Sequence, residues 1–236
     1  MRLSEVCMLC GFPFTSRDPG VDVRGWAADM LGKRGRAHYT CVCRSANEKS
    51  YRIGHVPWDI ARPHPALKQL VETGRMSVGT VFEPGPGLGD NALYLASHGF
   101  RVTAVDIAPA AVDTLRARAV SMGLGIEVYV GEVVFGLDSV RSGFDYVFER
   151  SFLQTLPPVI RPRYVERLER LLKPGGVYVG IIRGPRQPPP VTQPFAFTEA
   201  ELRSLFSASF EIVELQPTTS GHDDNLDFWL LMARLR

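Results

Sequence analysis

Three glycines at alternate positions, Gly85, Gly87 and Gly89, follow a short apolar run of the sequence directly. Glycine adopts backbone conformations that side chains exclude, so a bound group can approach the backbone amides of such a turn. Residues 91–97 continue with a helix-like pattern, and amides at a helix start attract polar or anionic groups. The sequence therefore predicts a strand over 79–83, a ligand-binding turn and a helix in succession.

Strand-like and helix-like segments alternate from residue 63 onward. We expect strands at 79–83, 101–106, 126–130, 144–148 and 177–182, and helices at 66–71, 91–97, 110–122 and 161–172. Alternation at this spacing favours a doubly wound α/β fold, in which helices cover both faces of a parallel sheet. Ligands of such sheets bind beyond the carboxyl ends of the strands.

Two acidic residues stand where a ligand of this turn would need them. Asp106 ends the strand after the glycine turn, and an acid there can accept both hydroxyl groups of a ribose. The alternative for Asp106 is an N-cap, because a helix follows within a few residues. Glu83 precedes Gly85 by two residues. Its alternative is a strand-end carboxylate in contact with solvent.

The segments VFEPGPGLG (residues 81–89) and TAVDI (residues 103–107) resemble the first two motifs of class I S-adenosylmethionine-dependent methyltransferases. This resemblance implies a Rossmann-like methyltransferase fold, with a mostly parallel seven-stranded sheet that ends in an antiparallel hairpin. It also implies which residues bind S-adenosylmethionine. Glu83 and the three glycines would hold its methionine end, and Asp106 and Ile107 its ribose.

The acid that binds the adenine in this class follows the third strand, which places it at Glu132, next to Val133. Aspartate is the commoner residue at that position. Glu132 would therefore reach the adenine with a longer side chain.

A narrower resemblance covers about residues 55–215. Pro57-Trp58-Asp59 resembles the start of plant-type thiol and halide methyltransferases, and residues 149–158 resemble a segment of thiopurine S-methyltransferases. In that segment Glu149, assigned with the cofactor, replaces the more usual aspartate. The resemblance implies an enzyme that moves a methyl group from S-adenosylmethionine to a small-molecule acceptor, a thiol or other soft nucleophile.

Three side chains are candidates for contact with the reacting groups. The aromatic face of Trp58 attracts a sulfonium; the alternative is a core tryptophan that anchors its segment. Arg150 would orient an anionic substrate, or else form a salt bridge to Glu149 or Glu132. His222 lies beside acidic residues and would serve as the base that a hydroxyl or amine acceptor needs, or else be a solvated loop histidine.

All four cysteines of the chain lie within its first 43 residues. Cys7 and Cys10 form a CxxC pair, and His38 with Cys41 forms an HxxC pair to which Cys43 adds a CxC. Paired thiolates and an imidazole suit a structural zinc ion. The alternative is two unrelated pairs in a partly ordered segment.

We accordingly expect a zinc-binding segment over residues 1–50 and a methyltransferase domain over 51–236. The proline-rich stretch 184–194 is predicted to be a lid over the substrate or a surface connection, since such segments are stiff.

The charge balance bears on partners and location. Lys and Arg number 27 against 25 Asp and Glu, a net charge of +2 that does not favour a nucleic-acid or membrane partner. No apolar run approaches the roughly 20 residues of a spanning helix, and the first residues lack the apolar core of a signal peptide. We expect a soluble cytoplasmic protein, a monomer or homodimer, with a small-molecule substrate.

Other functions stay open at this point. Residues 1–62 carry 10 Lys and Arg against 6 Asp and Glu, so a basic zinc segment could recognise RNA or a protein for methylation. An O- or N-methyltransferase of a natural-product intermediate is a further alternative. The last is a non-catalytic protein that senses the cofactor.

Overall fold

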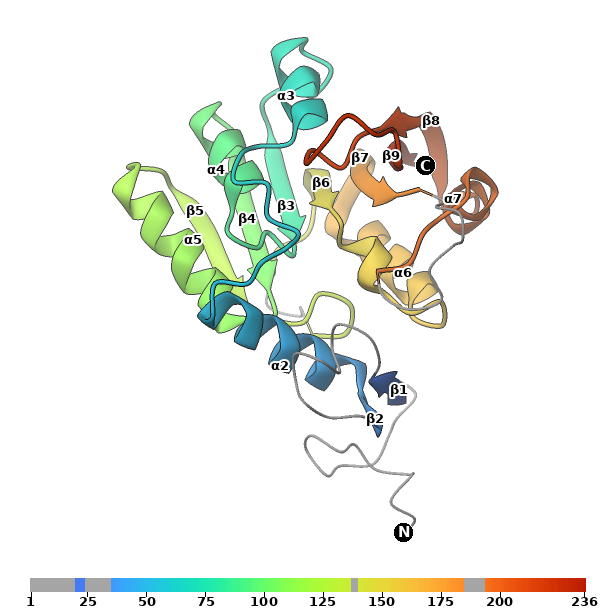
Figure 1. Ribbon diagram of the computed structural model, residues 1–236. Coiled ribbons are helices and arrows are strands. Elements are labelled where there is room, and N and C mark those ends of the chain that lie inside the picture. The colour runs from blue at the N-terminus through green and yellow to red at the C-terminus, as the bar shows by residue number, and fades with distance from the viewer. Residues whose placement is uncertain (1–19, 24–34, 137–139, 185–193) are drawn as a thin grey trace.

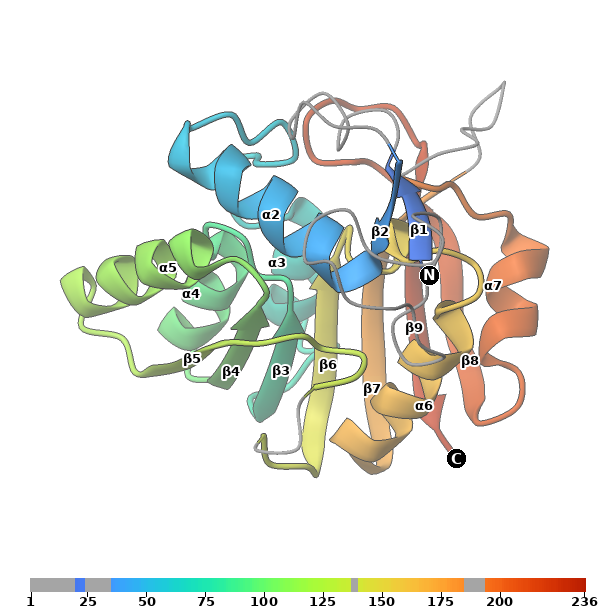
Figure 2. The same cartoon turned by 90° about the horizontal axis from the view of Figure 1, so that it is seen from below.

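The structure, a computed structural model, describes residues 20–23, 35–136, 140–184 and 194–236 (Figure 1). Its centre is a sheet of seven strands in the order β5-β4-β3-β6-β7-β9-β8, which Figure 2 shows side by side. The strands are β3 (Thr80–Pro84), β4 (Arg101–Asp106), β5 (Ile126–Val130), β6 (Phe144–Arg150), β7 (Leu172–Arg183), β8 (Phe210–Thr218) and β9 (Phe228–Leu235).

The first five strands of this order pair in parallel, from β5 through β4, β3 and β6 to β7. Strand β9 is antiparallel to both β7 and β8, so the sheet is mixed. The seven-stranded α/β sheet that the resemblance implied is confirmed. Strand β7 begins five residues earlier than expected, because Leu172 already pairs with Phe144 of β6.

Helices cover both faces of the sheet. One face packs against α3 (Pro65–Glu72), α4 (Asp90–Ser97) and α5 (Pro109–Ser121), the other against α6 (Arg161–Leu171) and α7 (Glu199–Phe206). Neighbouring residues of β3 belong to different clusters: Val81 packs with the first set of helices and Phe82 with the second. Alternate side chains of a strand point to opposite faces, so strands covered on both sides are apolar throughout.

Local sequence signals fix several helix ends. Proline stands at the first helical position of α3 and α5, where its missing N–H is no loss. Helix α7 begins with a capping box: Thr198 accepts from the amide of Glu201, and the Glu201 carboxylate accepts from the amide of Thr198. The sequence predicts this box, because Thr and Glu stand three residues apart before an apolar run.

The N-terminal region contains regular structure that the sequence analysis did not expect. Strands β1 (Gly20–Val23) and β2 (Gly35–His38) form an antiparallel pair, and α2 (Tyr39–Arg52) follows directly. Helix α2 lies across the end of the sheet toward which β3 and β4 point (Figure 1). It therefore covers the edge at which a doubly wound sheet binds its ligand.

The zinc prediction is not supported in the part of the chain that the structure describes, where no three His, Cys, Asp or Glu residues gather as a metal site. Cys7 and Cys10 lie outside the described residues, as does the side chain of His38. Cys41 and Cys43 lie on helix α2, not on a metal-binding loop. Side chains two residues apart on a helix do not face each other, so the CxC spacing does not make a ligand pair.

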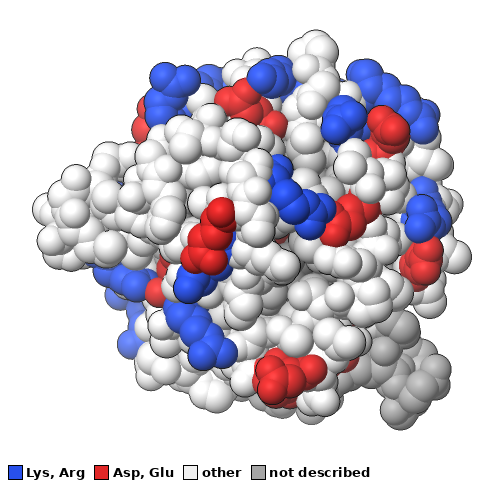
Figure 3. All heavy atoms as spheres, turned by 90° about the horizontal axis from the view of Figure 1, so that it is seen from above, with Lys and Arg blue, Asp and Glu red and all other residues white. Residues whose placement is uncertain are grey.

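Helix α2 runs through residue 50, and the predicted division at that residue stays a prediction. The proline-rich stretch 185–193 lies outside the described residues. Within the described ranges no helix is both long and apolar enough to span a bilayer. On the face that Figure 3 shows, basic and acidic side chains are interspersed, with no broad patch of one sign.

Candidate active site

The glycine turn after β3 is closely packed. Gly85 and Gly87 have φ angles of +62° and +59°, in the left-handed region that favours glycine. The amide of Gly85 donates to the carbonyl of Val105 at 2.8 Å, which ties the turn to β4. A Cβ atom at Gly85 would lie 2.9 Å from the ring of Phe152. The turn therefore tolerates no side chain at this position.

Glu83, near the end of β3, is 2% exposed, and its Oε2 atom has no hydrogen-bond partner among the described residues. Burial, followed by the nearby carboxylates of Asp90 and Asp106, raises its pKa to about 8. Isolated buried charge is costly, so an ionised Glu83 calls for a cationic partner. An ammonium group, such as that of the amino-acid end of S-adenosylmethionine, would be a partner of this kind for the unpartnered Oε2 atom.

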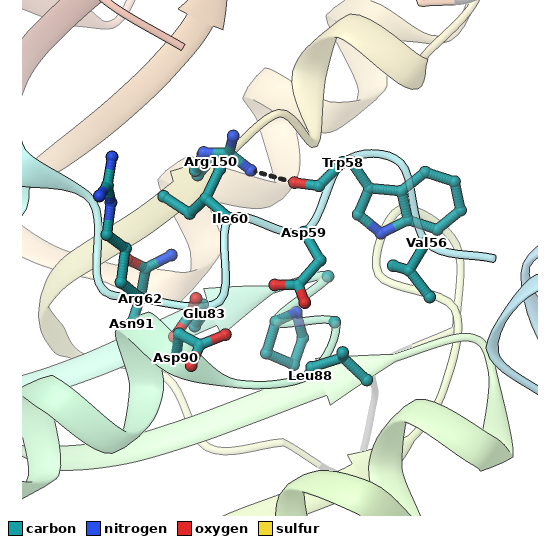
Figure 4. Close-up of a pocket in the computed structure, with 13 residues that line it drawn as sticks. Val56, Trp58, Asp59, Ile60, Arg62, Glu83, Leu88, Asp90, Asn91 and Arg150 are labelled. Atoms are coloured by element: carbon teal, nitrogen blue, oxygen red, sulfur yellow. Dashed lines mark hydrogen bonds between the residues drawn. The ribbon is translucent and has the colours of Figure 1, made fainter. Parts of the chain in front are cut away.

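A small cavity of about 50 Å³ adjoins Glu83. Figure 4 shows the carboxylates of Glu83 and Asp90 beneath the segment that carries Trp58 and Asp59, with Arg150 above. Acidic side chains thus line this cavity from below, at Glu83 and Asp90, and from above, at Asp59. An amino-acid group with its ammonium end towards the acids suits these walls.

Asp106, the last residue of β4, is 5% exposed. Its carboxylate accepts from the amide of Gly87 at 3.2 Å and from the amide of Ala108 at 2.9 Å. Helix α5 begins at Pro109 with Ala108 as its N-cap, so Asp106 is not the cap that the alternative required. Burial raises the pKa of Asp106 to about 6.

A larger cavity of about 400 Å³ opens beside Asp106 at the carboxyl ends of the strands. It brings together seven of the residues predicted to contact cofactor or substrate, which are Trp58, Gly85, Asp106, Ile107, Glu132, Val133 and Arg150. Helix α2 supplies a further wall through Val42, Cys43, Asn47 and Tyr51. Residues far apart in the sequence thus line one space that can hold a nucleoside.

Glu132 lies in the wall of this cavity, with its carboxylate turned towards its own loop. One oxygen accepts from the amide of Val134 at 2.9 Å, and the other accepts from the amide of Phe135. The carboxylate therefore stabilises the turn after β5. Its contact with an adenine stays a prediction.

Arg150 fastens the Trp58 segment, by which we mean residues 56–62, to the rest of the molecule. One guanidinium nitrogen donates to the carbonyl of Trp58 at 2.7 Å, and another donates to the carbonyl of Ser220 at 2.6 Å. These partners of Arg150 are backbone carbonyls, where the sequence alternative was a salt bridge to Glu149 or Glu132. Burial lowers the pKa of Arg150 to about 10, which leaves it charged at neutral pH.

Trp58 is half-buried and lines both cavities. Its indole Nε1–H donates to the hydroxyl of Tyr51 at 3.2 Å, and the two rings meet edge to face with centroids 5.8 Å apart. The contact joins the Trp58 segment to α2. The ring therefore anchors its segment and lines both cavities, and its contact with a sulfonium stays a prediction.

Three predicted site residues line neither of these cavities. Gly89 is the N-cap of α4. Glu149 is fully buried and accepts from the Tyr178 hydroxyl at 2.7 Å and from the Phe152 amide at 2.7 Å. These bonds hold the turn after β6, and burial raises the pKa of Glu149 to about 7. His222 is exposed, on the loop between β8 and β9. The side chains of Glu149 and His222 therefore do not line the cavities with the other predicted site residues.

Sequence reasoning missed three residues at or near the site. Buried His64 accepts from the amide of Ala66 as the N-cap of α3, and its Nε2 lies 3.1 Å from the carbonyl of Thr219. Its signal was a polar residue before a helix-starting proline. Ser151 has a φ of +68°, a strained conformation beside the cavity, and no sequence signal marked it. Gln154 is 5% exposed and lines the larger cavity, again without a motif.

A parallel sheet with a glycine turn after β3, an acid at the end of β4 and an antiparallel C-terminal hairpin defines the Rossmann-like fold of S-adenosylmethionine-dependent methyltransferases. The thiopurine S-methyltransferase family matches residues 45–226, and the chain belongs to this family.

Three known proteins similar to this chain illustrate the relationship. "Probable thiol methyltransferase 2" of Arabidopsis thaliana is 32% identical over 57% of this chain, which spans 60% of that protein's length. The 2-heptyl-1-hydroxyquinolin-4(1H)-one methyltransferase of Mycobacteroides abscessus is 26% identical over 72% of this chain and 78% of its own. A solved structure of the Burkholderia thailandensis 1,6-didemethyltoxoflavin-N1-methyltransferase holds its substrate and S-adenosylhomocysteine. It is 25% identical, with a TM-score of 0.65 over 79% of this chain and 84% of its own.

Proposed function

We propose that this protein transfers a methyl group from S-adenosylmethionine to a small-molecule acceptor, with a thiol or other soft nucleophile as the receiving atom. The observation that carries the proposal is the pair of adjoining cavities, one beside the unpartnered carboxylate oxygen of Glu83 and one beside Asp106, among the described residues. Family membership of the chain supports the same activity.

The residues divide between the two ends of the donor. Glu83 binds the ammonium group, the glycine turn leaves room for the methionine chain, and Asp106 accepts from the ribose hydroxyls. When bound, S-adenosylmethionine supplies a methyl group already activated on a sulfonium sulfur. The protein therefore needs chiefly to orient the acceptor and to exclude water.

No histidine is among the described residues that line the larger cavity, so no imidazole base is available there. A thiol ionises near neutral pH without a strong base, and the thiolate is the nucleophile. The positive charge of Arg150 at the cavity wall stabilises that thiolate. The acceptor sulfur then bonds to the methyl carbon as the bond from that carbon to the sulfonium sulfur breaks. The His222 base is not required for this acceptor.

Methylation of oxygen or nitrogen on a heterocycle is the second candidate. Two similar proteins favour it, because their names specify a hydroxyquinolone and a toxoflavin precursor. Trp58 and Phe152 offer aromatic surface to a planar ring in either case.

A panel of thiols, phenols and heterocyclic amines, each incubated with methyl-labelled S-adenosylmethionine, tests the proposal. We expect label in the thiol products. Label in none of the thiols would remove the sulfur acceptor, and label in phenols or amines alone would establish the second candidate. Binding of S-adenosylhomocysteine without transfer to any compound would favour a cofactor-sensing protein.

A further inference from the structure

Gln154 presents an unused hydrogen-bond donor to the larger cavity. It lies in the single turn η2 (Leu153–Thr155) after β6, is 5% exposed, and lines the cavity. Its backbone is fixed, because its carbonyl accepts from the amide of Phe195 at 2.8 Å. The position of the side chain follows from a second contact.

The amide oxygen of the Gln154 side chain accepts from the backbone amide of Arg183 at 2.7 Å. Only an oxygen can accept there, so the orientation of the side-chain amide is determined by its partner. This contact leaves the two N–H donors of the Nε2 atom unused.

The Nε2 atom makes no hydrogen bond within the described ranges. It is also not one of the unpartnered side-chain atoms that are completely buried, so it retains accessible surface. Because Gln154 is almost wholly buried and lines the cavity, this surface lies in the cavity. A buried donor without a partner is costly, so a ligand with an acceptor atom gains by meeting it.

Strand order separates Gln154 from the residues assigned to the donor. Asp106 ends β4 and the glycine turn follows β3, whereas Gln154 follows β6 on the opposite side of β3. The part of the cavity beside Gln154 is therefore left for the acceptor. Trp58 and Phe152 add aromatic walls to the same cavity.

We infer that Gln154 selects the acceptor: a planar molecule whose nucleophilic atom stands next to a hydrogen-bond acceptor, such as a carbonyl oxygen or an unprotonated ring nitrogen. The Nε2–H of Gln154 donates to that neighbouring atom and so places the nucleophile. The inference rests on the proposed function for the position of the donor. It names a feature of the substrate that a methyltransferase fold by itself does not require.

Two thiols of similar size test the inference. ortho-Acetylbenzenethiol carries a carbonyl beside the thiol, and in ortho-isopropylbenzenethiol a methyl group stands in place of the carbonyl oxygen. Their dissociation constants are measured by calorimetry with the full chain saturated with S-adenosylhomocysteine, and their methylation rates are measured separately. We expect the wild-type protein to bind the carbonyl compound about tenfold more tightly, which is the scale of one well-formed hydrogen bond in an enclosed site.

Gln154→Glu keeps the oxygen that accepts from Arg183 and replaces the two N–H donors. Gln154→Met removes donor and acceptor alike, and so guards against a glutamic acid side chain that stays protonated at this position and still donates. Both variants should bind the two thiols with affinities equal within twofold and retain wild-type affinity for S-adenosylhomocysteine. Gln69→Glu, an exposed change of the same kind on α3, should keep the tenfold preference.

Equal binding of the two thiols to the wild-type protein, no binding of either, or a preference that survives in both Gln154 variants would overturn the inference. Methylation of both thiols at equal rates with equal affinities would leave the proposed function intact and remove the role of Gln154. A Gln154-dependent preference without methylation would uphold the inference and count against thiol transfer.

Discussion

Arg150 donates a 2.7 Å hydrogen bond to the carbonyl of Trp58, although 92 positions separate the two residues in the sequence. The same guanidinium group donates to the carbonyl of Ser220. Two neighbouring contacts reinforce the junction: Arg62 donates to the carbonyl of Gly221 at 2.9 Å, and His64 meets the carbonyl of Thr219. The Trp58 segment, which lines the smaller cavity, is thus held to the loop between β8 and β9.

Replacement of Arg150 by Met should lower the free energy of unfolding by about 2 kcal/mol, because partly buried hydrogen bonds from a charged donor to two carbonyls are lost. Urea unfolding measures the change, and proteolysis should become faster within residues 56–62. Arg163→Met, on the exposed side of α6, should change stability by less than about 0.5 kcal/mol. An equal effect of both changes would contradict the clamp.

Glu83→Gln should weaken S-adenosylhomocysteine binding by about 2 kcal/mol, because the ammonium group loses an ionic partner in a buried site. Adenosine, which lacks the amino-acid end, should bind the variant and the wild type alike. Titration calorimetry with both ligands measures the difference. Glu166→Gln, exposed on α6, is the matched control. A comparable loss for adenosine would place Glu83 elsewhere along the donor.

Asp106→Ala should weaken adenosine and S-adenosylhomocysteine binding equally, by about 1–3 kcal/mol, since both ligands carry the ribose. The variant also frees the amides of Gly87 and Ala108, so its thermal midpoint is recorded alongside. Asp113→Ala removes only an exposed pair with Arg116 and should leave binding unchanged. If adenosine affinity stays at the wild-type value, the ribose assignment is wrong.

The raised pKa of Glu83 predicts how ligand-free stability depends on pH. In the folded protein Glu83 keeps its proton up to a pKa of about 8, whereas an unfolded glutamate loses it near 4.5. The folded state binds the extra proton between these values, so stability falls as pH rises through the window. Thermal unfolding from pH 5 to 8 should show a shallower fall for Glu83→Gln. Parallel curves for the two proteins would mean that Glu83 is ionised in the folded state.

His64 acts in the opposite sense at lower pH. Burial, followed by the charge of Arg150, lowers its pKa from 6.5 to about 4, so the unfolded chain binds a proton that the folded one does not. Stability from His64 is therefore present above pH 6.5 and is lost as pH falls towards 4. His64→Asn keeps a capping side chain and should unfold at a lower pH than the wild type. Identical acid midpoints would show that His64 does not limit stability there.

Local sequence patterns predicted the parallel strands of the sheet, because each pattern reflects an effect that acts over a few residues. Apolar residues such as Val81 and Phe82, glycines in left-handed turns, and prolines at helix starts act on the backbone within a few residues of themselves. The positions of Glu83 and Asp106 at strand ends followed from the same patterns. Helix α2 was missed, because its mixed composition indicates a helix only once the helix packs against α5.

The sequence by itself determined the order of strands and helices from α3 to β7, the glycine turn, and the acidic residues at the carboxyl edge of the sheet. Only the tertiary structure decided which side chains share the cavity. Glutamate and histidine often serve in catalysis, but the Glu149 carboxylate is hydrogen-bonded within the core and His222 is exposed. Gln154 carries no motif, but the amide of Arg183 fixes one end of its side chain and leaves the other as a donor. Such roles depend on hydrogen bonds between distant segments, and residue spacing along the chain does not encode these bonds.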